Sequence, residues 1–170
     1  MKNNLSFLLI ADTSGSMYGE KIYALNMAVS NLLGGFHEIS LDEENEPQMA
    51  IITYGGSPKL HTPFTPVRKI EFSEFEAYGD STLTEALLLA KTIIKQKTTI
   101  ILISDGSTND GCYTRAIEDI DLKDKIYCIP VGFDADMDML EHFAGVDGHI
   151  LSLSDAETMA GYFLRVLSED

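Results

Sequence analysis

Three oxygen-bearing side chains stand two residues apart near the start of the chain. Asp12, Ser14 and Ser16 follow a mostly apolar run, residues 5–11, and Gly15 separates the two serines. A carboxylate and hydroxyls offer only oxygen atoms, which are the ligands that hard cations such as Mg²⁺ prefer. The same residue types are common at helix caps and at catalytic turns after strands. Other parts of the chain are needed to distinguish a metal site from these alternatives.

Two further segments carry the same kinds of side chain. Asp105 comes directly after the apolar run 99–104, and Ser81 and Thr82 lie in a polar loop before a helical pattern. Each segment alone is consistent with a helix cap or a turn. In open parallel sheets, however, ligands bind beyond the carboxyl ends of the strands. Two strand-end carboxylates and several hydroxyls at one edge therefore predict a binding site.

Hydrophobic periodicity predicts the elements that would position these residues. Continuous apolar runs are typical of strands covered on both faces, and 3.6-residue spacing is typical of amphipathic helices. We expect strands at residues 5–11, 49–54, 59–63, 99–104, 126–131 and 149–153. We expect helices at residues 20–36, 84–95, 115–122, 137–144 and from 155 onward, with the first one loosening at Gly34-Gly35.

The alternation of strands and helices predicts the fold class. It is typical of an α/β, Rossmann-like, doubly wound and mostly parallel six-stranded sheet with helices on both faces. The turn at 55–58 and the prolines after it predict that strand 59–63 returns antiparallel at an edge, where prolines are tolerated. In the helix at 84–95 we expect Leu87, Ala90, Lys91 and Ile94 to lie on one stripe.

Composition limits the classes of function. The 170 residues carry a formal net charge of −15, the sequence pI is about 4.4, and 45% of the residues are apolar. These values indicate one soluble domain over residues 1–170, which we expect to be a monomer on its own. The acidity argues against binding to nucleic acid or to an anionic membrane surface.

The cysteine count and the apolar runs predict the compartment. Cys112 and Cys128 are the two cysteines, and they make neither a disulfide framework nor a zinc cluster. Reduced thiols are typical of cytosolic proteins. No segment approaches the ~20 apolar residues that a membrane span needs. We therefore expect a cytoplasmic protein.

These motifs resemble those of the von Willebrand factor type A domains, which share their fold with integrin I domains. The metal-ion-dependent adhesion site of that family consists of D-x-S-x-S, a distant Thr, and a distant Asp followed by Gly. Asp12-Thr13-Ser14-Gly15-Ser16 matches the first part, and Asp105-Gly106 matches the last. The resemblance covers nearly the whole chain, including the order and spacing of the elements.

The middle part of the motif departs from the family pattern. The usual loop reads G-x-T-x-L-x-x-A-L, and alignment on the apolar residues of 83–87 places Ser81 at the threonine position. Thr82 would take that position only if the loop shifted by one residue. The resemblance thus implies Mg²⁺, with Mn²⁺ or Ca²⁺ as alternatives, and the metal ligands Asp12, Ser14, Ser16, Ser81 and Asp105.

The resemblance also implies a function. In this family the metal leaves a coordination position open for a carboxylate of a partner protein. We therefore expect a protein–protein interaction module, not an enzyme, whose partner presents an Asp or Glu. The segments DTSGSM, GEKI, AIITYGG and LISDG are similar to bacterial cytoplasmic members associated with tellurite resistance and stress operons, which implies an adaptor role. Aromatic side chains are common at interaction hot spots, so the candidate contacts around the site are Tyr18, Tyr78 and Tyr113.

The same residues also suggest other interpretations. A metal-dependent phosphohydrolase would use Asp12 as nucleophile, as aspartyl-phosphate phosphatases do, but Ser14 stands where the general acid is needed. A scaffold of the same fold with an inert metal site is the second alternative. The acidic run 134–138 begins like an EF-hand, yet Met139 stands where that loop requires glycine, so we expect a helix N-terminus there.

Overall fold

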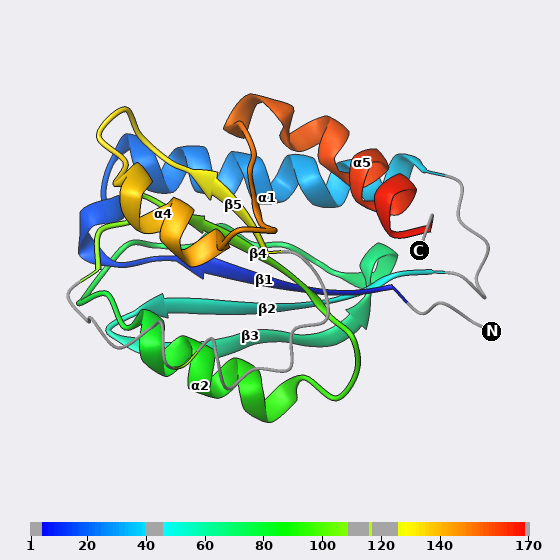
Figure 1. Cartoon of the computed structure of the whole chain (residues 1–170), viewed down its shortest axis with the longest axis horizontal. Coiled ribbons are helices and arrows are strands. Elements are labelled where there is room, and N and C mark those ends of the chain that lie inside the picture. The colour runs from blue at the N-terminus through cyan, green and yellow to red at the C-terminus, as the bar shows by residue number, and fades with distance from the viewer. Residues whose placement is uncertain (1–4, 40–45, 109–115, 117–125, 169–170) are drawn as a thin grey trace.

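The computed structural model describes residues 5–39, 46–108, 116 and 126–168. The described strands form one six-stranded sheet in the order β3-β2-β1-β4-β5-β6, with β1 in its interior (Figure 1). β2 and β3 are antiparallel, and the other neighbouring pairs are parallel. The strands are β1 Ser6–Asp12, β2 Gln48–Gly55, β3 Ser57–Pro66, β4 Thr99–Ser104, β5 Ile126–Pro130 and β6 His149–Ile150.

Helices cover both faces of the sheet, which confirms the predicted fold class. Figure 1 shows α1 and α5 side by side over one face and α2 beneath the other. α4 contributes to the same apolar cluster as α2. The helices are α1 Glu20–Glu38, α2 Leu83–Ile93, α4 Met137–Ala144 and α5 Ala156–Ser168. Within the described ranges, none of them combines the length and the apolar character that crossing a membrane requires.

The apolar run of β1 is explained by its position between the two helical layers. Phe7, Leu9 and Ala11 pack in the cluster of α1 and α5, whereas Leu8 and Ile10 pack in that of α2 and α4. Phe7 is fully buried, and its ring lies 5.5 Å from that of Phe36 and 5.6 Å from that of Phe163. Full burial of one such side chain contributes about 1.5–3 kcal/mol. This packing fixes the position of Asp12, the last residue of β1.

Some predicted boundaries are wrong, and burial explains one of these errors. α1 continues through Gly34-Gly35 to Glu38 because Phe36 is buried, which offsets the cost of about 1 kcal/mol per helical glycine. In α2, Lys91 is exposed and Ile94 lies beyond the helix. β6 has only two residues instead of the five expected. The buried residues of α2 are Leu83, Ala86, Leu87 and Ala90.

Several predictions fall on residues that the structure does not describe. The helix expected at 115–122 lies outside the described residues except for Ala116, which is buried. Cys112 and the candidate contact Tyr113 also lie outside them. The expected helix at 137–144 is confirmed, and Asp136 caps it by accepting a hydrogen bond from the backbone N–H of Met139 at 3.0 Å. The acidic run is therefore a helix N-terminus, as expected.

A buried amide ties the long connection before α2 to α1. Asn26 Nδ2 donates to the carbonyl oxygen of Phe75 at 3.0 Å, and the backbone N–H of Phe75 donates to Asn26 Oδ1 at 2.9 Å. Asn26 is 6% exposed and Phe75 is 8% exposed. Without the Asn26 side chain, water would therefore not reach the backbone N–H and carbonyl of Phe75 to replace these hydrogen bonds. The segment that leads to Ser81 is thus anchored by one side chain.

We expect Asn26→Leu to destabilise the protein by about 1–3 kcal/mol for each backbone group of Phe75 that it leaves unpaired. Urea unfolding at equilibrium measures the change. Ser30→Ala, at an exposed position of the same helix, is the control and should shift the free energy of unfolding by less than about 0.5 kcal/mol. Equal effects of the two substitutions would contradict the anchoring role.

Cys128 lies in β5 and is buried, and burial raises the pKa of its thiol to about 12. Because the thiolate is the reactive form, this side chain should be inert at neutral pH. In a Cys112→Ser variant at pH 8, we expect a disulfide reagent to label Cys128 more than about a hundredfold faster in 8 M urea than in buffer. Equal rates would mean that the thiol is accessible in the folded protein.

Candidate metal site

The candidate site lies where the order of the strands reverses. β1 has β2 on one side and β4 on the other, and the chain builds the sheet outward in both directions from this pair. β1 and β4 are parallel, so Asp12 at the end of β1 and Asp105 after β4 reach the same edge. This edge is where open α/β sheets bind ligands.

Asp12 is the most buried member of the site. Its side chain is 0% exposed, and Oδ1 accepts hydrogen bonds from the backbone N–H of Ser14 at 3.0 Å and from Ser14 Oγ at 2.6 Å. Oδ2 accepts from Ser104 Oγ at 2.6 Å. Burial raises the pKa of Asp12 even though the hydrogen bonds from Ser104 and Ser14 lower it. A nearby cation would relieve this destabilisation of the charged form.

The neighbouring phenol responds to the same charge. Tyr54 is paired with Asp12 in the register of β1 and β2 and is 1% exposed. Burial, and then the carboxylate of Asp12, raise the pKa of Tyr54 well above its ordinary value. The Tyr54 side chain therefore stays neutral and adds no charge to the site.

Hydrogen bonds dock the loop before α2 against the first loop of the site. The backbone N–H of Gly15 donates to the carbonyl oxygen of Gly79 at 2.8 Å, and that of Tyr78 donates to the carbonyl oxygen of Thr13 at the same distance. These contacts bring the start of α2, with Ser81, to the sheet edge. Loops as close as these leave no space for side chains between their backbones.

Two hydroxyls of this segment lack the partners that buried polar atoms normally have. In the described part of the molecule, Ser81 Oγ and Thr82 Oγ1 are buried without a hydrogen-bond partner. Thr82 stands at the N-cap of α2, yet its side chain makes no capping hydrogen bond. Buried polar groups without a partner are rare and indicate a missing ion, water or ligand. A cation that accepts hydroxyl lone pairs fits both atoms.

The remaining predicted ligands are placed as follows. Ser16 is exposed in the 3-10 turn Gly15–Met17, and its Oγ lies 3.2 Å from Ser14 Oγ. Asp105 is 2% exposed, and its Oδ1 accepts from the backbone N–H of Ser107 at 2.9 Å. The structure thus puts Asp12, Ser14 and Ser16 in direct contact, Asp105 on the adjacent strand end, and Ser81 on the loop docked beside them.

The donor set is suited to a hard cation. It contains two carboxylates and hydroxyl oxygens, with no nitrogen or sulfur ligand. Among the described residues, no group of three or more His, Cys, Asp and Glu side chains is arranged to hold a metal ion by itself. Any ion at this edge would therefore take part of its coordination from hydroxyls, as Mg²⁺ and Mn²⁺ can and Zn²⁺ rarely does.

An ammonium group also belongs to this edge. Lys21 Nζ lies 3.0 Å from Asp105 Oδ2 and 2.8 Å from Asp134 Oδ1. Burial lowers the pKa of Lys21, but its hydrogen bonds to Asp134 and Asp105 outweigh this effect and raise it. The pKa of Asp134 is lowered by its hydrogen bond from Lys21. The ammonium is therefore charged and shared between two carboxylates.

The sequence did not indicate a role in the site for four residues of this edge. They are Tyr54, Lys21, Asp134 and Ser104, and the hydroxyl of Ser104 orients Asp12. Ser104 and Lys21 lie inside two motifs that signalled the family, LISDG and GEKI. Nothing in the spacing indicates the ion pairs of Lys21, because they join residues 84 and 113 positions apart.

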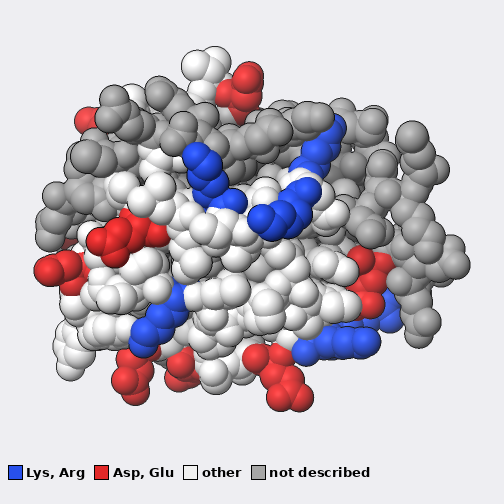
Figure 2. All heavy atoms as spheres, turned by 90° about the horizontal axis from the view of Figure 1, so that it is seen from below, with Lys and Arg blue, Asp and Glu red and all other residues white. Residues whose placement is uncertain are grey.

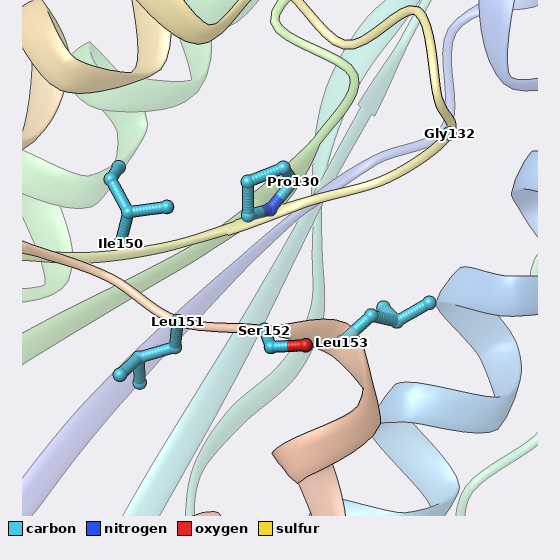
Figure 3. A pocket seen from close by; sticks show the side chains of 6 residues that line it. All are labelled: Pro130, Gly132, Ile150, Leu151, Ser152 and Leu153. Carbon is cyan, nitrogen blue, oxygen red and sulfur yellow. The ribbon is translucent and has the colours of Figure 1, made fainter.

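A separate hollow of about 470 Å³ opens beyond the end of β5 (Figure 3). Its lining residues are Pro130, Gly132, Ile150, Leu151, Ser152 and Leu153. None of them carries an ionisable side chain, so this hollow offers no acid, base or charged metal ligand. Among the described residues, the buried carboxylates of Asp12 and Asp105 lie at the carboxylate edge and not in this hollow.

The fold and this edge together define an open α/β sheet protein with an oxygen-rich site at its switch point. The sequence profile of the von Willebrand factor type A domains matches residues 7–107, and the chain belongs to that family. A curated relative, inter-alpha-trypsin inhibitor heavy chain H4 from Sus scrofa, is 26% identical over 164 aligned residues. The match covers 83% of this chain and 17% of the relative, so the chain corresponds to a small part of that protein.

Solved structures share the fold at low sequence identity. An aerotolerance-related membrane protein from Bacteroides fragilis, with multiple mutations to serines, superposes with a TM-score of 0.70 at 12% identity and covers 98% of this chain and 100% of its own. A von Willebrand factor type A protein from Catenulispora acidiphila gives 0.69 at 18% identity, covering 96% and 42%. Manganese-loaded TRAP protein from Plasmodium vivax gives 0.69 at 14% identity, covering 96% and 74%.

The close approach of the loops predicts an asymmetric response to alanine. At Gly55 an added Cβ would lie 2.2 Å from the carbonyl oxygen of Thr13, which is backbone and cannot move aside. We expect Gly55→Ala to destabilise the protein by at least about 1–3 kcal/mol. Gly34→Ala, where nothing lies within 4 Å of the added Cβ, should instead stabilise α1 by up to about 1 kcal/mol. Thermal unfolding of both variants checks this, and a shift of the same sign would contradict it.

Proposed function

We propose that this chain is a metal-dependent protein-interaction module. The ion is Mg²⁺, with Mn²⁺ or Ca²⁺ as alternatives, and its ligands are Asp12, Ser14, Ser16, Ser81 and Asp105. The observation that carries this proposal is the pair of buried, unpartnered hydroxyls of Ser81 and Thr82 beside the two strand-end carboxylates. The manganese in the Plasmodium vivax relative is consistent with it.

The residues would divide the work as follows. Hydroxyls of Ser14, Ser16 and Ser81 would bind the ion without neutralising it, and Asp12 and Asp105 would supply the negative charge directly or through water. A bound divalent ion supplies an electrophilic centre that attracts a carboxylate. Ser104 would hold the carboxylate of Asp12 in place, as outer partners of metal ligands commonly do.

The partner is then a protein that presents an Asp or Glu to the ion. The net charge of −15 repels an acidic partner from the surface in general, so the metal would make binding local and conditional. Tyr18 and Tyr78 stand on loops of this edge, 82% and 46% exposed, and are available as contacts. The same net charge supports a partner other than nucleic acid or an anionic membrane. On the face seen from below, Lys and Arg side chains and Asp and Glu side chains both lie on a largely uncharged surface (Figure 2).

The setting that we propose is an adaptor role in a bacterial stress-response or tellurite-resistance-type system, in the cytoplasm. A monomeric single domain over residues 1–170 suits such a role. A catalytic role is less well supported, because both oxygens of Asp12 accept hydrogen bonds and its side chain is 0% exposed. A phosphohydrolase would need that carboxylate as a free nucleophile.

Calorimetric titration of EDTA-treated protein with Mg²⁺ and Mn²⁺ tests the proposal. We expect one site in the wild type and none in Asp12→Ala, because the charge that holds the ion is lost. Ser104→Ala should weaken binding by about 10–100-fold through loss of orientation. Ser154→Ala, at an exposed position whose hydroxyl contacts Ser152 and none of the predicted ligands, is the control and should leave the affinity unchanged.

The same titration separates the two candidate hydroxyls. If Ser81 is the ligand, Ser81→Ala weakens binding and Thr82→Val does not; the reverse pattern would assign Thr82. Absence of binding in the wild type, to either ion, would leave a scaffold of this fold with an inert site. Unchanged affinity in Asp12→Ala would place the ion elsewhere.

A further inference from the structure

We propose that Lys21 is a built-in competitor of the metal: its ammonium occupies Asp105 in the metal-free protein and passes to Asp134 when a divalent ion binds. This inference rests on the proposed function of the site. The ammonium of Lys21 contacts a predicted metal ligand, because its Nζ lies 3.0 Å from Asp105 Oδ2. The second carboxylate, Asp134, lies within 2.8 Å of the same nitrogen.

Lys21 carries its positive charge near the N-terminus of a helix. It lies in the first turn of α1, where the helix dipole disfavours positive charge. The two carboxylates offset this cost, so contacts across the edge hold the side chain there and helical preference does not. The loop after β5 also leaves room for it, because a Cβ at Gly132 would lie 2.8 Å from Lys21 Cε.

Both oxygens of Asp105 already accept a hydrogen bond, one of them from the ammonium of Lys21. Oδ1 of Asp105 already accepts a backbone hydrogen bond from Ser107, and Oδ2 accepts from Lys21. A divalent ion at Asp105 would meet a positive charge within a few ångströms, in a place where Asp105 is only 2% exposed and screening is weak. Ion and ammonium therefore compete for one carboxylate.

Asp134 lowers the free-energy cost of moving the ammonium away from Asp105. It is 53% exposed at its side chain, lies in the loop after β5, and already binds the ammonium with both oxygens, at 2.8 and 3.0 Å. Lys21 can leave Asp105 without becoming unpaired and without moving its backbone. The pair Lys21–Asp134 would thus set the affinity of the site, with Lys21 lowering it and Asp134 raising it.

Mg²⁺ titration of Lys21→Met, Asp134→Asn and the double variant tests the inference by calorimetry. We expect Lys21→Met to bind Mg²⁺ at least about tenfold more tightly than the wild type, because the competitor is gone. Asp134→Asn should bind about three- to tenfold more weakly, because Lys21 then has only Asp105. In the Lys21→Met background, Asp134→Asn should have almost no further effect.

The double variant distinguishes exchange from simple charge. If Asp134 acted only as a distant negative charge, its substitution would weaken binding equally in both backgrounds. Lys69→Met, in the 3-10 turn Val67–Lys69 beyond the opposite end of β3, is the charge-matched control and should change the affinity less than twofold. A second readout is the melting temperature: Lys21→Met should melt lower than the wild type without metal and gain more from saturating Mg²⁺.

The outcomes separate this inference from the proposed function. Wild-type binding with unchanged or weaker binding in Lys21→Met would overturn the inference and leave the metal site standing. Binding in Lys21→Met alone would contradict both proposals for the wild type, because the ammonium would then exclude the ion instead of passing to Asp134. Absence of Mg²⁺ and Mn²⁺ binding in all variants would overturn both proposals together.

Discussion

The carboxylate of Asp12 must be compensated in a place that water does not reach, and this constraint organises the whole edge of the sheet. Apolar packing on both faces of β1 buries its last residue, and burial favours the protonated form. Hydrogen bonds from Ser14 and Ser104 oppose that tendency without adding positive charge. The ammonium of Lys21 pairs with Asp105 and Asp134, whereas the donors to Asp12 are the neutral groups of Ser14 and Ser104. On the loop docked at this edge, the buried hydroxyls of Ser81 and Thr82 lack hydrogen-bond partners.

Much of this edge could be predicted because local patterns determine it. The run 99–104 has to be a strand covered on both faces, and the structure has β4 at these residues. Asp12 and Asp105 follow apolar strands that are parallel neighbours, so their meeting follows from topology once the fold class is known. The part that sequence could not predict depends on contacts between distant residues. The sequence around Lys21 indicates only a residue of the first helical turn. Its ion pair with Asp134 forms because the fold places the loop after β5 next to it.

Errors in the predicted elements have the same physical origin. Glycines in an isolated helix favour its end, yet α1 passes through two of them because Phe36 packs against Phe7 in the sheet. Conversely, the pattern at 149–153 suggested a full strand, whereas β6 pairs with β5 at only two positions. Tertiary burial lengthened one element, and loss of pairing at the sheet edge shortened the other. Neither effect can be read from a single window of sequence.

The charges of the edge explain why partner binding would depend on metal. Three carboxylates, Asp12, Asp105 and Asp134, and one ammonium, Lys21, sum formally to −3 + 1 = −2. In this state an approaching carboxylate is repelled. Lys21 attracts it only weakly, because Asp105 and Asp134 already share the ammonium. A divalent ion brings the sum to 0 and, if hydroxyls supply much of its coordination, keeps local positive charge facing outward. Lys21 pairs with Asp105 when no ion is present, but it does not offer a free positive charge to a partner. In the proposed function, the bound ion would supply the positive charge that a partner's Asp or Glu recognises.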